Sequence, residues 1–332
     1  MPGEHIGLHG NAKSDGLLEL ALEVGVGRIV VDSLEEIDRL GRIAAARKVV
    51  APCFVRVTTG VHAGGHDFIA TAHEDQKFGL SLATGAAREA VDRISTCPNL
   101  DLVGIHSHIG SQILDPSGFV AAARRVIDFI AGLPVPVPEV DLGGGYGIQY
   151  TGHDPAPLDP AEMIAMIRQE ITGACAEAGV PLPSLSIEPG RSIVGPAGVS
   201  VYTVETTKSV MTEAGERLYV SVDGGMSDNI RPALYGAAYT AMMDRVSDAP
   251  LVQSRVVGMH CESGDILVCD VALPSDIHRG DTLVVAATGA YGRVMGSNYN
   301  LVPRPGVLSL GQSGTTWLVR PETWEDVAAG LG

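Results

Sequence analysis

The sequence predicts an α/β protein: an incomplete TIM-type (β/α)8 barrel, with about six of the eight βα units present, followed by an antiparallel β domain. Over the first two-thirds, short β-branched or apolar runs alternate with amphipathic stretches, the pattern of βα units around a parallel sheet. From about residue 199, short β-rich runs separated by turn residues take over. We therefore expect a barrel domain over residues 1–197 and a β-rich domain over residues 198–332.

The barrel strands are expected where apolar runs end in polar or glycine residues, at residues 6–9, 28–31, 49–57, 100–106, 139–142 and 185–188. A helix is expected to begin at Ser33, with Glu36 reaching back in a capping box. Further helices are expected over about 86–94, 118–130 and 161–178. In the second domain, strands are expected at residues 199–206, 217–222, 256–259, 266–268, 282–287 and 307–310.

The number of strands falls short of a closed barrel. A closed βα barrel needs eight strands, whereas about six are found before the β domain begins. An open arc leaves unpaired edges, which proteins normally avoid. The expectation is that two βα units are absent upstream of Met1.

Length, charge and cysteine content exclude several classes of protein. The chain has 332 residues and a formal net charge of −16, so neither nucleic acid nor an anionic membrane is an expected partner. No apolar run approaches the ~20 residues of a membrane span. The start, Met1-Pro-Gly-Glu-His, shows no secretory signal, and five scattered cysteines do not form a disulfide framework. We expect a cytoplasmic protein.

Polar residues gather at four predicted strand ends, where a βα barrel places its active site. One of these ends, Asp141-Leu-Gly-Gly-Gly-Tyr-Gly147, is glycine-rich, and its backbone could approach a phosphate closely, although a flexible turn is the alternative. Another, Glu188-Pro-Gly-Arg191, places a carboxylate and an arginine together. The carboxylate could face a pyridine nitrogen and the arginine could bind phosphate or carboxylate, or the two could form a structural salt bridge.

Histidines and a cysteine supply further candidates. His106 and His108 are two residues apart and expected on one side of a strand. A zinc site is the rival interpretation, but no third ligand lies at a useful spacing, and a core histidine is the bland alternative for His108. Cys261 and Glu262 precede Asp265 in a turn. They could be a buried thiol beside a surface acid, whereas a Cys-His protease is disfavoured by the β-rich setting.

We also expect no metal at the glycine-rich loop that contains His62, His66 and His73. Whether that loop, residues 60–73, acts as a lid or a passive connector is left open, with the connector as the default.

Eight segments occur in the order of one known family. They are His9-Gly-Asn-Ala-Lys-Ser14, His73-Glu-Asp-Gln-Lys-Phe-Gly-Leu80, His106-Ser-His-Ile-Gly-Ser-Gln-Ile113, Asp141-Leu-Gly-Gly-Gly145, Glu188-Pro-Gly-Arg191, Asp223-Gly-Gly-Met-Ser-Asp-Asn-Ile-Arg-Pro-Ala-Leu-Tyr235, Cys261-Glu-Ser-Gly-Asp265 and Gly289-Ala-Tyr-Gly292. Almost end to end, the chain resembles the ornithine/diaminopimelate/arginine decarboxylase family of fold-type III enzymes. The resemblance implies pyridoxal 5′-phosphate as cofactor, and conversion of meso-2,6-diaminopimelate to L-lysine and CO2 in lysine biosynthesis.

The resemblance also implies roles for individual residues. His108 would stack on the cofactor ring and Glu188 would pair with its nitrogen. The phosphate site would be lined by Ser111, Gly144, Gly145, the segment Glu188, Pro189, Gly190 and Arg191, and Tyr291. Arg191, Arg231, Tyr235, Glu262 and Tyr291 would bind substrate, and Cys261 would be the catalytic proton donor. A homodimer with shared active sites is implied, because the family supplies Cys261 and Glu262 to the neighbouring subunit.

One family feature is missing. The lysine that links the cofactor lies in a Tyr-Ala-x-Lys-Ala-type motif at the end of the family's first barrel strand, and this sequence has no such motif. Lys13 matches the family's third strand end instead. The chain alone is therefore expected to be inactive. The alternatives are a lysine-less binding protein and another fold-type III amino-acid decarboxylase.

Overall fold

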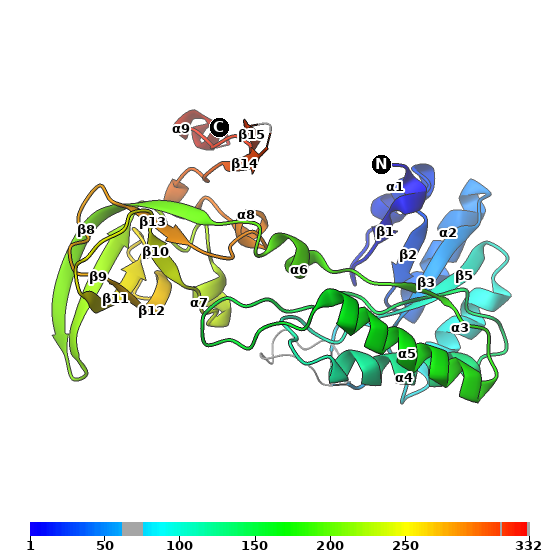
Figure 1. Ribbon diagram of the computed structural model, residues 1–332. Helices are drawn as coiled ribbons and strands as arrows, with labels where there is room; N and C mark the ends of the chain where they lie inside the picture. The colour runs from blue at the N-terminus through cyan, green and yellow to red at the C-terminus, as the bar shows by residue number, and fades with distance from the viewer. Residues whose placement is uncertain (62–75, 313, 331–332) are drawn as a thin grey trace. The chain divides into compact units, whose positions relative to one another are not determined.

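The computed structural model describes residues 1–61, 76–312 and 314–330 (Figure 1). The chain divides into two compact units. Unit 1 comprises Met1–Gly147 and Ala156–Gly190, and unit 2 comprises Ile148–Pro155 and Arg191–Gly332. The predicted domain boundary between residues 197 and 198 stays a prediction.

Unit 1 is built on a parallel sheet with helices against it, which confirms the predicted incomplete barrel. The strands pair in the order β1-β2-β3-β5-β6-β7, and β4 also pairs with β3. Among the described residues the two edge strands, β1 and β7, do not pair with each other, so the sheet is open. Its strands are β1 (Gly7–Leu8), β2 (Arg28–Val31), β3 (Ala51–Thr58), β4 (Leu80–Ser81), β5 (Leu100–Ser107), β6 (Glu139–Asp141) and β7 (Ser184–Ser186).

Except for η1 (Gly3–His5), which precedes β1, the helices of unit 1 follow the strands in the chain, as in βα units. They are η1 (Gly3–His5), α1 (Asp15–Glu23), α2 (Leu34–Arg47), α3 (Ala86–Thr96), α4 (Ser117–Ala131), α5 (Pro160–Ala178) and α6 (Gly190–Val194, which ends in unit 2). Leu40 and Ile127 show why they pack: each is fully buried on the apolar stripe of its helix. The unit therefore has one continuous core between the sheet and these helices.

The predicted capping box at Ser33 is only half correct. The Ser33 hydroxyl accepts a hydrogen bond from Glu36 N at 3.2 Å, as expected. However, the Glu36 carboxylate accepts from the backbone of Asp32, at 2.9 Å, and pairs with Lys13 at 2.8 Å. A buried ammonium nearby is a stronger partner for a carboxylate than a neutral amide, so Glu36 joins α2 to the segment that precedes α1.

Unit 2 contains a six-stranded sheet in the order β10-β13-β8-β9-β11-β12. The predicted β domain is confirmed, but it is not wholly antiparallel, because β9 and β11 run parallel. The strands are β8 (Ser200–Thr212), β9 (Gly215–Val222), β10 (Ala241–Met243), β11 (Leu251–Val257), β12 (Ile266–Pro274) and β13 (Thr282–Val285), with β14 (Val307–Gly311) and β15 (Gly314–Val319) in a separate hairpin. Short helices are α7 (Arg231–Tyr235), α8 (Gly292–Met295), η3 (Tyr299–Leu301) and α9 (Trp324–Ala328).

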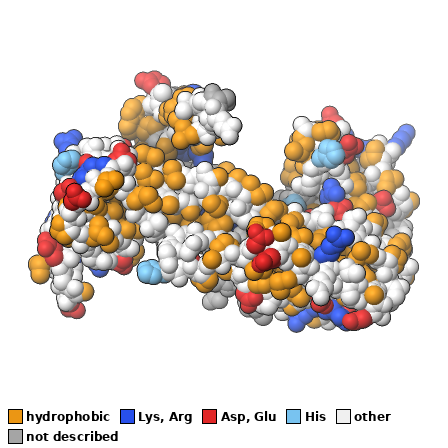
Figure 2. All heavy atoms as spheres, viewed as in Figure 1, with side chains coloured by type: hydrophobic (Ala, Val, Ile, Leu, Met, Phe, Trp, Pro, Cys, Tyr) orange, Lys and Arg blue, Asp and Glu red, His pale blue; other side chains and the backbone are white. Residues whose placement is uncertain are grey.

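On the face drawn in Figure 2, acidic and basic side chains are interspersed, with no broad basic patch. In the described parts of the chain, no helix is long and apolar enough to cross a bilayer.

Candidate functional site

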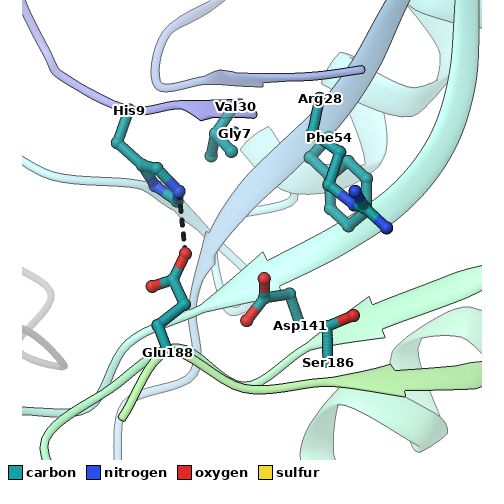
Figure 3. A pocket seen from close by; sticks show the side chains of 8 residues that line it. All are labelled: Gly7, His9, Arg28, Val30, Phe54, Asp141, Ser186 and Glu188. Carbon is teal, nitrogen blue, oxygen red and sulfur yellow. Dashed lines mark ion pairs between the residues drawn. The ribbon is translucent and has the colours of Figure 1, made fainter. Parts of the chain in front are cut away.

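The ends of β1, β5 and β7 bring three polar side chains of unit 1 together. His9 Nε2 lies 2.8 Å from Glu188 Oε1, and His106 Nε2 lies 3.4 Å from Glu188 Oε2. Figure 3 shows His9 and Glu188 pointing toward each other. Both residues line a cavity of about 230 Å³. The cavity is lined by Gly7, His9, Arg28, Val30, Phe54, Asp141, Ser186 and Glu188. Parallel strands deliver their carboxyl ends to one edge of the sheet, so the sequence prediction that strand ends converge is correct for these residues.

The carboxyl group of Glu188 is held ionised. Partial burial alone would raise its pKa, but hydrogen bonds from His106 and His9 outweigh that and hold the pKa well below its ordinary value. Nearby Asp141 shows the opposite shift: burial first, and then the charge of Glu188, raises the pKa of its carboxyl. The geometry thus singles out Glu188 as the fixed negative charge at this edge of the sheet.

His108 is held differently from His106. It lies just beyond the end of β5, and its Nδ1 accepts a hydrogen bond from Gly144 N at 3.2 Å. Burial, followed by the charges of Arg56 and His106, lowers the pKa of His108 to about 4. The ring is therefore a neutral, flat imidazole at physiological pH, with its tautomer fixed by the backbone.

The glycine loop after β6 packs too closely against its neighbours for side chains. A Cβ at Gly144 would lie 2.4 Å from Glu188 O, and one at Gly145 would lie 2.3 Å from Gly110 O. Gly143 and Gly145 also have positive φ values, +68° and +112°, which glycine adopts without strain. These glycines hold the ends of β5, β6 and β7 at backbone contact distance.

The other predicted cofactor residues lie on the same loops. Ser111 follows β5 and is half-buried, and Pro189 is half-buried directly after Glu188. Gly190 is exposed, begins α6, and donates its backbone N–H to Glu188 O at 2.8 Å. These positions agree with a loop cluster around Glu188, and the roles of the three residues stay predictions.

Lys13 is not placed for cofactor chemistry. It is 2% exposed, and its ammonium group pairs with Glu36 and donates to Gly10 O at 2.5 Å. A buried, paired ammonium is neither accessible nor free to act as a nucleophile. The chain's other lysines are Lys48, Lys77 and Lys208, and Lys208 lies on β8 of unit 2.

In unit 2, two buried arginines share a tyrosine hydroxyl. Arg191 and Arg231 are each 6% exposed. The hydroxyl of Tyr150 accepts hydrogen bonds from Nη1 of Arg191 and, at 3.0 Å, from Nη1 of Arg231. The Tyr239 hydroxyl also accepts from Arg231 Nη1, at 2.5 Å. Burial raises the pKa of Tyr239, although Arg231 opposes the shift. The result is a concentration of positive charge held by neutral phenols.

Tyr291 joins this cluster, with its ring 4.9 Å from the guanidinium carbon of Arg191. Tyr291 has a positive φ of 62°. In the same loop, Gly289 packs so closely against Val194 that a Cβ at Gly289 would lie 1.9 Å from Val194 O. Tyr235, at the end of α7, is half-buried. Tyr235 and Tyr291 were predicted from the sequence, whereas Tyr150 and Tyr239 were not, because neither lies in a family motif. Tyr150 meets arginines 41 and 81 residues away, and Tyr239 meets Arg231 from just beyond the motif that ends at Tyr235.

Cys261 and Glu262 lie on an exposed turn held by Asp265. The Asp265 carboxylate accepts hydrogen bonds from Met226 N at 2.6 Å and His260 N at 2.8 Å. Cys261 is exposed, and Glu262 accepts a hydrogen bond from the Tyr299 hydroxyl at 2.5 Å, which raises the pKa of Tyr299. The buried aspartate thus fixes a turn that presents the thiol and the carboxylate to solvent.

Three potential metal ligands lie close together at the end of the sheet in unit 1. Ligand atoms of His9, His106 and Glu188 lie within 4.8 Å of one another, so the fold supplies partners for His106 that sequence spacing had not revealed. The hydrogen bonds within this cluster already satisfy Glu188, and the absence of a metal stays a prediction. The loop containing His62, His66 and His73 falls outside the described residues.

Comparisons with known proteins point to one family. A sequence profile described as "Pyridoxal-dependent decarboxylase, pyridoxal binding domain" matches residues 1–195. The diaminopimelate decarboxylase of Mycobacterium tuberculosis is 50% identical over 337 aligned positions, covering 98% of this chain and 75% of that protein. The Bacillus subtilis enzyme of the same name is 41% identical, covering 98% of this chain and 74% of that protein.

Solved structures agree. Diaminopimelate decarboxylase from M. jannaschii matches with a TM-score of 0.90 and 30% identity, covering 99% of this chain and 74% of that one. The Helicobacter pylori enzyme, complexed with L-lysine, matches with a TM-score of 0.85 and 28% identity, over 96% of this chain and 77% of that one. Lysine/ornithine decarboxylase from Vibrio vulnificus, at 24% identity and a TM-score of 0.70, shares the fold.

Proposed function

The chain belongs to the family of pyridoxal-dependent decarboxylases, and we propose that the reaction it serves is the decarboxylation of meso-2,6-diaminopimelate to L-lysine and CO2, a step of lysine biosynthesis. The observation that carries the proposal is the pair of buried guanidinium groups, Arg191 and Arg231, held together by the Tyr150 hydroxyl. Such a pair suits a second amino-acid head group, which diaminopimelate has and ornithine lacks.

The residues of unit 1 fit pyridoxal 5′-phosphate as the cofactor. When bound, the cofactor supplies an electron sink for the carbanion that remains when CO2 leaves. His108 offers a neutral ring for stacking, and the ionised Glu188 can keep a pyridine nitrogen protonated. The phosphate site would be lined by Ser111, Gly144, Gly145, Pro189 and Gly190. At Gly144 and Gly145, neighbouring backbone atoms lie too close for a side chain.

The residues of unit 2 would bind and protonate the substrate. Arg191, Arg231 and Tyr235 would hold the carboxylate that is not lost, and Glu262 would bind the ammonium group beside it. Tyr291, packed on Arg191, would contact both cofactor and substrate. Cys261, exposed on its turn, would deliver a proton from Sγ to the carbon that loses CO2.

The proposed enzyme also has an expected oligomeric state and cellular location. We place the working enzyme in the cytoplasm as a homodimer with shared active sites, with Cys261 and Glu262 serving the neighbouring subunit. Cys261 and Glu262 are both exposed, which agrees with that role. The free thiols of all five cysteines agree with a reducing compartment.

Because this chain has no Tyr-Ala-x-Lys-Ala-type motif to supply the linking lysine, the chain alone is expected to bind the cofactor without turning over. The buried pairing of Lys13 with Glu36 supports this expectation. Borohydride treatment of the pyridoxal phosphate-loaded chain, followed by peptide mass spectrometry, should therefore leave Lys13 unmodified. A reduced cofactor adduct on Lys13 accompanied by CO2 release would overturn the expectation.

Substrate identity can be tested with a chimera. The chain covers 75% of the Mycobacterium tuberculosis enzyme. In the chimera, the remaining, unmatched part of that enzyme is joined to this chain. Release of CO2 from meso-diaminopimelate, and not from L-ornithine or L-lysine, is expected. Faster turnover of ornithine would favour another fold-type III decarboxylase. Cofactor binding without any turnover would favour the lysine-less binding protein.

A further inference from the structure

Tyr150 reaches the arginine cluster on a short segment with its own local support. The segment Ile148–Pro155 follows β6 in the chain but belongs to unit 2. Within it, Asp154 Oδ2 accepts hydrogen bonds from Tyr150 N at 2.9 Å and Thr151 N at 2.8 Å. Tyr150 is 8% exposed, and its ring packs edge-on against Tyr239, with ring centroids 5.1 Å apart. Backbone and ring are therefore both fixed.

The hydroxyl of Tyr150 holds two positive charges without cancelling them. A phenol oxygen has two acceptor lone pairs, and here they receive Nη1 of Arg191 and Nη1 of Arg231. A carboxylate in the same place would hold both guanidinium groups equally well, but its negative charge would reduce their attraction for another anion. A neutral acceptor orders both arginines and places no negative charge beside them.

The orientation of Arg231 indicates what that charge is for. Its Nη1 donates to both Tyr150 and Tyr239. Among the described residues, none accepts a hydrogen bond from Nε or Nη2 of Arg231, and no ion pair involves its guanidinium group. The Nε–Nη2 edge is a planar two-donor fork that matches the two oxygens of a carboxylate. The two tyrosines thus use one nitrogen and leave that edge for a ligand.

We propose that Tyr150 is a positioning residue for carboxylate recognition: its hydroxyl orients the Arg191 and Arg231 side chains as one unit and leaves the Nε–Nη2 edge of Arg231 for a carboxylate group of an amino-acid ligand. This inference rests on the proposed function, in which the recognised carboxylate is the one that meso-diaminopimelate and L-lysine have in common. It adds Tyr150, and the use of a neutral acceptor, to the residues that determine specificity.

The test compares two ligands that differ by that carboxylate. Cadaverine is L-lysine without its carboxyl group. Both are titrated calorimetrically into the full chain, with pyridoxamine 5′-phosphate filling the cofactor site because it has no aldehyde to react with an amine. The wild-type chain should prefer L-lysine. In Tyr150→Phe the preference should fall about tenfold, the size expected for a lost hydrogen bond to a charged group, whereas cadaverine affinity should stay unchanged.

Two more variants test whether the change in ligand preference comes from the neutral hydroxyl of Tyr150. Tyr150→Glu keeps an acceptor for both arginines but adds negative charge, so it should remove the preference for L-lysine even though the arginines remain held. Tyr219→Phe makes the same chemical change on β9, away from the cluster, and should behave as wild type. Because Tyr→Phe changes no charge, the ratio of the two affinities isolates the hydroxyl.

The outcomes separate this inference from the function on which it rests. If the wild-type chain prefers L-lysine and Tyr150→Phe keeps the full preference, the positioning role is wrong and the proposed function stands. If Tyr150→Glu retains the preference, the neutral-acceptor argument is wrong. If the wild-type chain shows no preference for L-lysine, the arginines form no carboxylate site, and both the proposed function and the role of Tyr150 are overturned.

Discussion

Replacing Lys13 with Met should destabilise unit 1, because it leaves a buried carboxylate without its cation. The side chains of Lys13 and Glu36 are 1% and 4% exposed, and their charged atoms lie 2.8 Å apart. After the replacement, Glu36 would retain only hydrogen bonds such as that from Asp32 N. Removing one partner of a buried pair costs about 3–5 kcal/mol. That corresponds to an increase of roughly a hundredfold to a few thousandfold in the unfolding equilibrium constant.

The assay must report on unit 1 alone. Trp317 and Trp324 both lie in unit 2, so tryptophan fluorescence does not report on the stability of unit 1. Cys53 is a suitable probe, because it is fully buried in β3, beside β2. Its labelling by a thiol reagent, followed by peptide mass spectrometry across a denaturant series, gives the free energy of opening around this part of the sheet.

The control is Lys48→Met, which removes an exposed ammonium group in the same unit and should change stability by less than about 0.5 kcal/mol. The double variant Lys13→Met/Glu36→Leu should recover part of the loss, because it removes the stranded charge as well. A loss below about 1 kcal/mol in Lys13→Met would show that the buried pair does not have the energy assigned to it here.

Two further predictions concern the edge of the sheet where the cofactor is proposed to bind. Gly144→Ala should weaken binding of pyridoxal phosphate, followed by absorbance, because a Cβ there lies 2.4 Å from Glu188 O, whereas Gly152→Ala meets nothing within 4 Å and should bind normally. Glu188, whose folded-state pKa lies below the ordinary 4.5, contributes stability that is present above pH 4.5 and lost as the pH falls through the lower folded value. In Glu188→Gln, the free energy of unfolding of unit 1 should therefore depend less on pH below pH 4.5. An unchanged pH dependence would contradict the lowered pKa assigned to Glu188.

The sheet of unit 1 was predictable because its strands are short apolar runs between turn signals. Residues 28–31 were predicted as a strand and form β2 with the same bounds, and their last three side chains are buried. The convergence of His106, Glu188 and the glycine loop also followed from sequence, since parallel strands end at a common edge. Helix α1 was missed because its apolar residues do not all face the core: Leu18 is buried, whereas Leu20 is half exposed.

Other features depend on contacts that no local pattern encodes. Strand β15 is exposed along its whole length, so it lacks the alternation that reveals a strand. The Glu36 side chain pairs with Lys13, 23 residues away, and not with the expected backbone partner at the start of its helix. Tyr150 and Tyr239 matter through arginines that lie 81 and 8 residues from them, respectively. Family motifs identified the arginines, but the phenols that orient them became visible only in three dimensions.

The interleaving of the two units limits how this protein can be taken apart. A single cut between Gly190 and Arg191 would produce a C-terminal piece with both arginines but without the segment Ile148–Pro155. That piece would lack Tyr150, and its guanidinium groups would face each other without the oxygen between them. Neither unit can therefore be exchanged as a contiguous cassette. A recombination event at that junction would carry over the charges and leave behind the residue that arranges them.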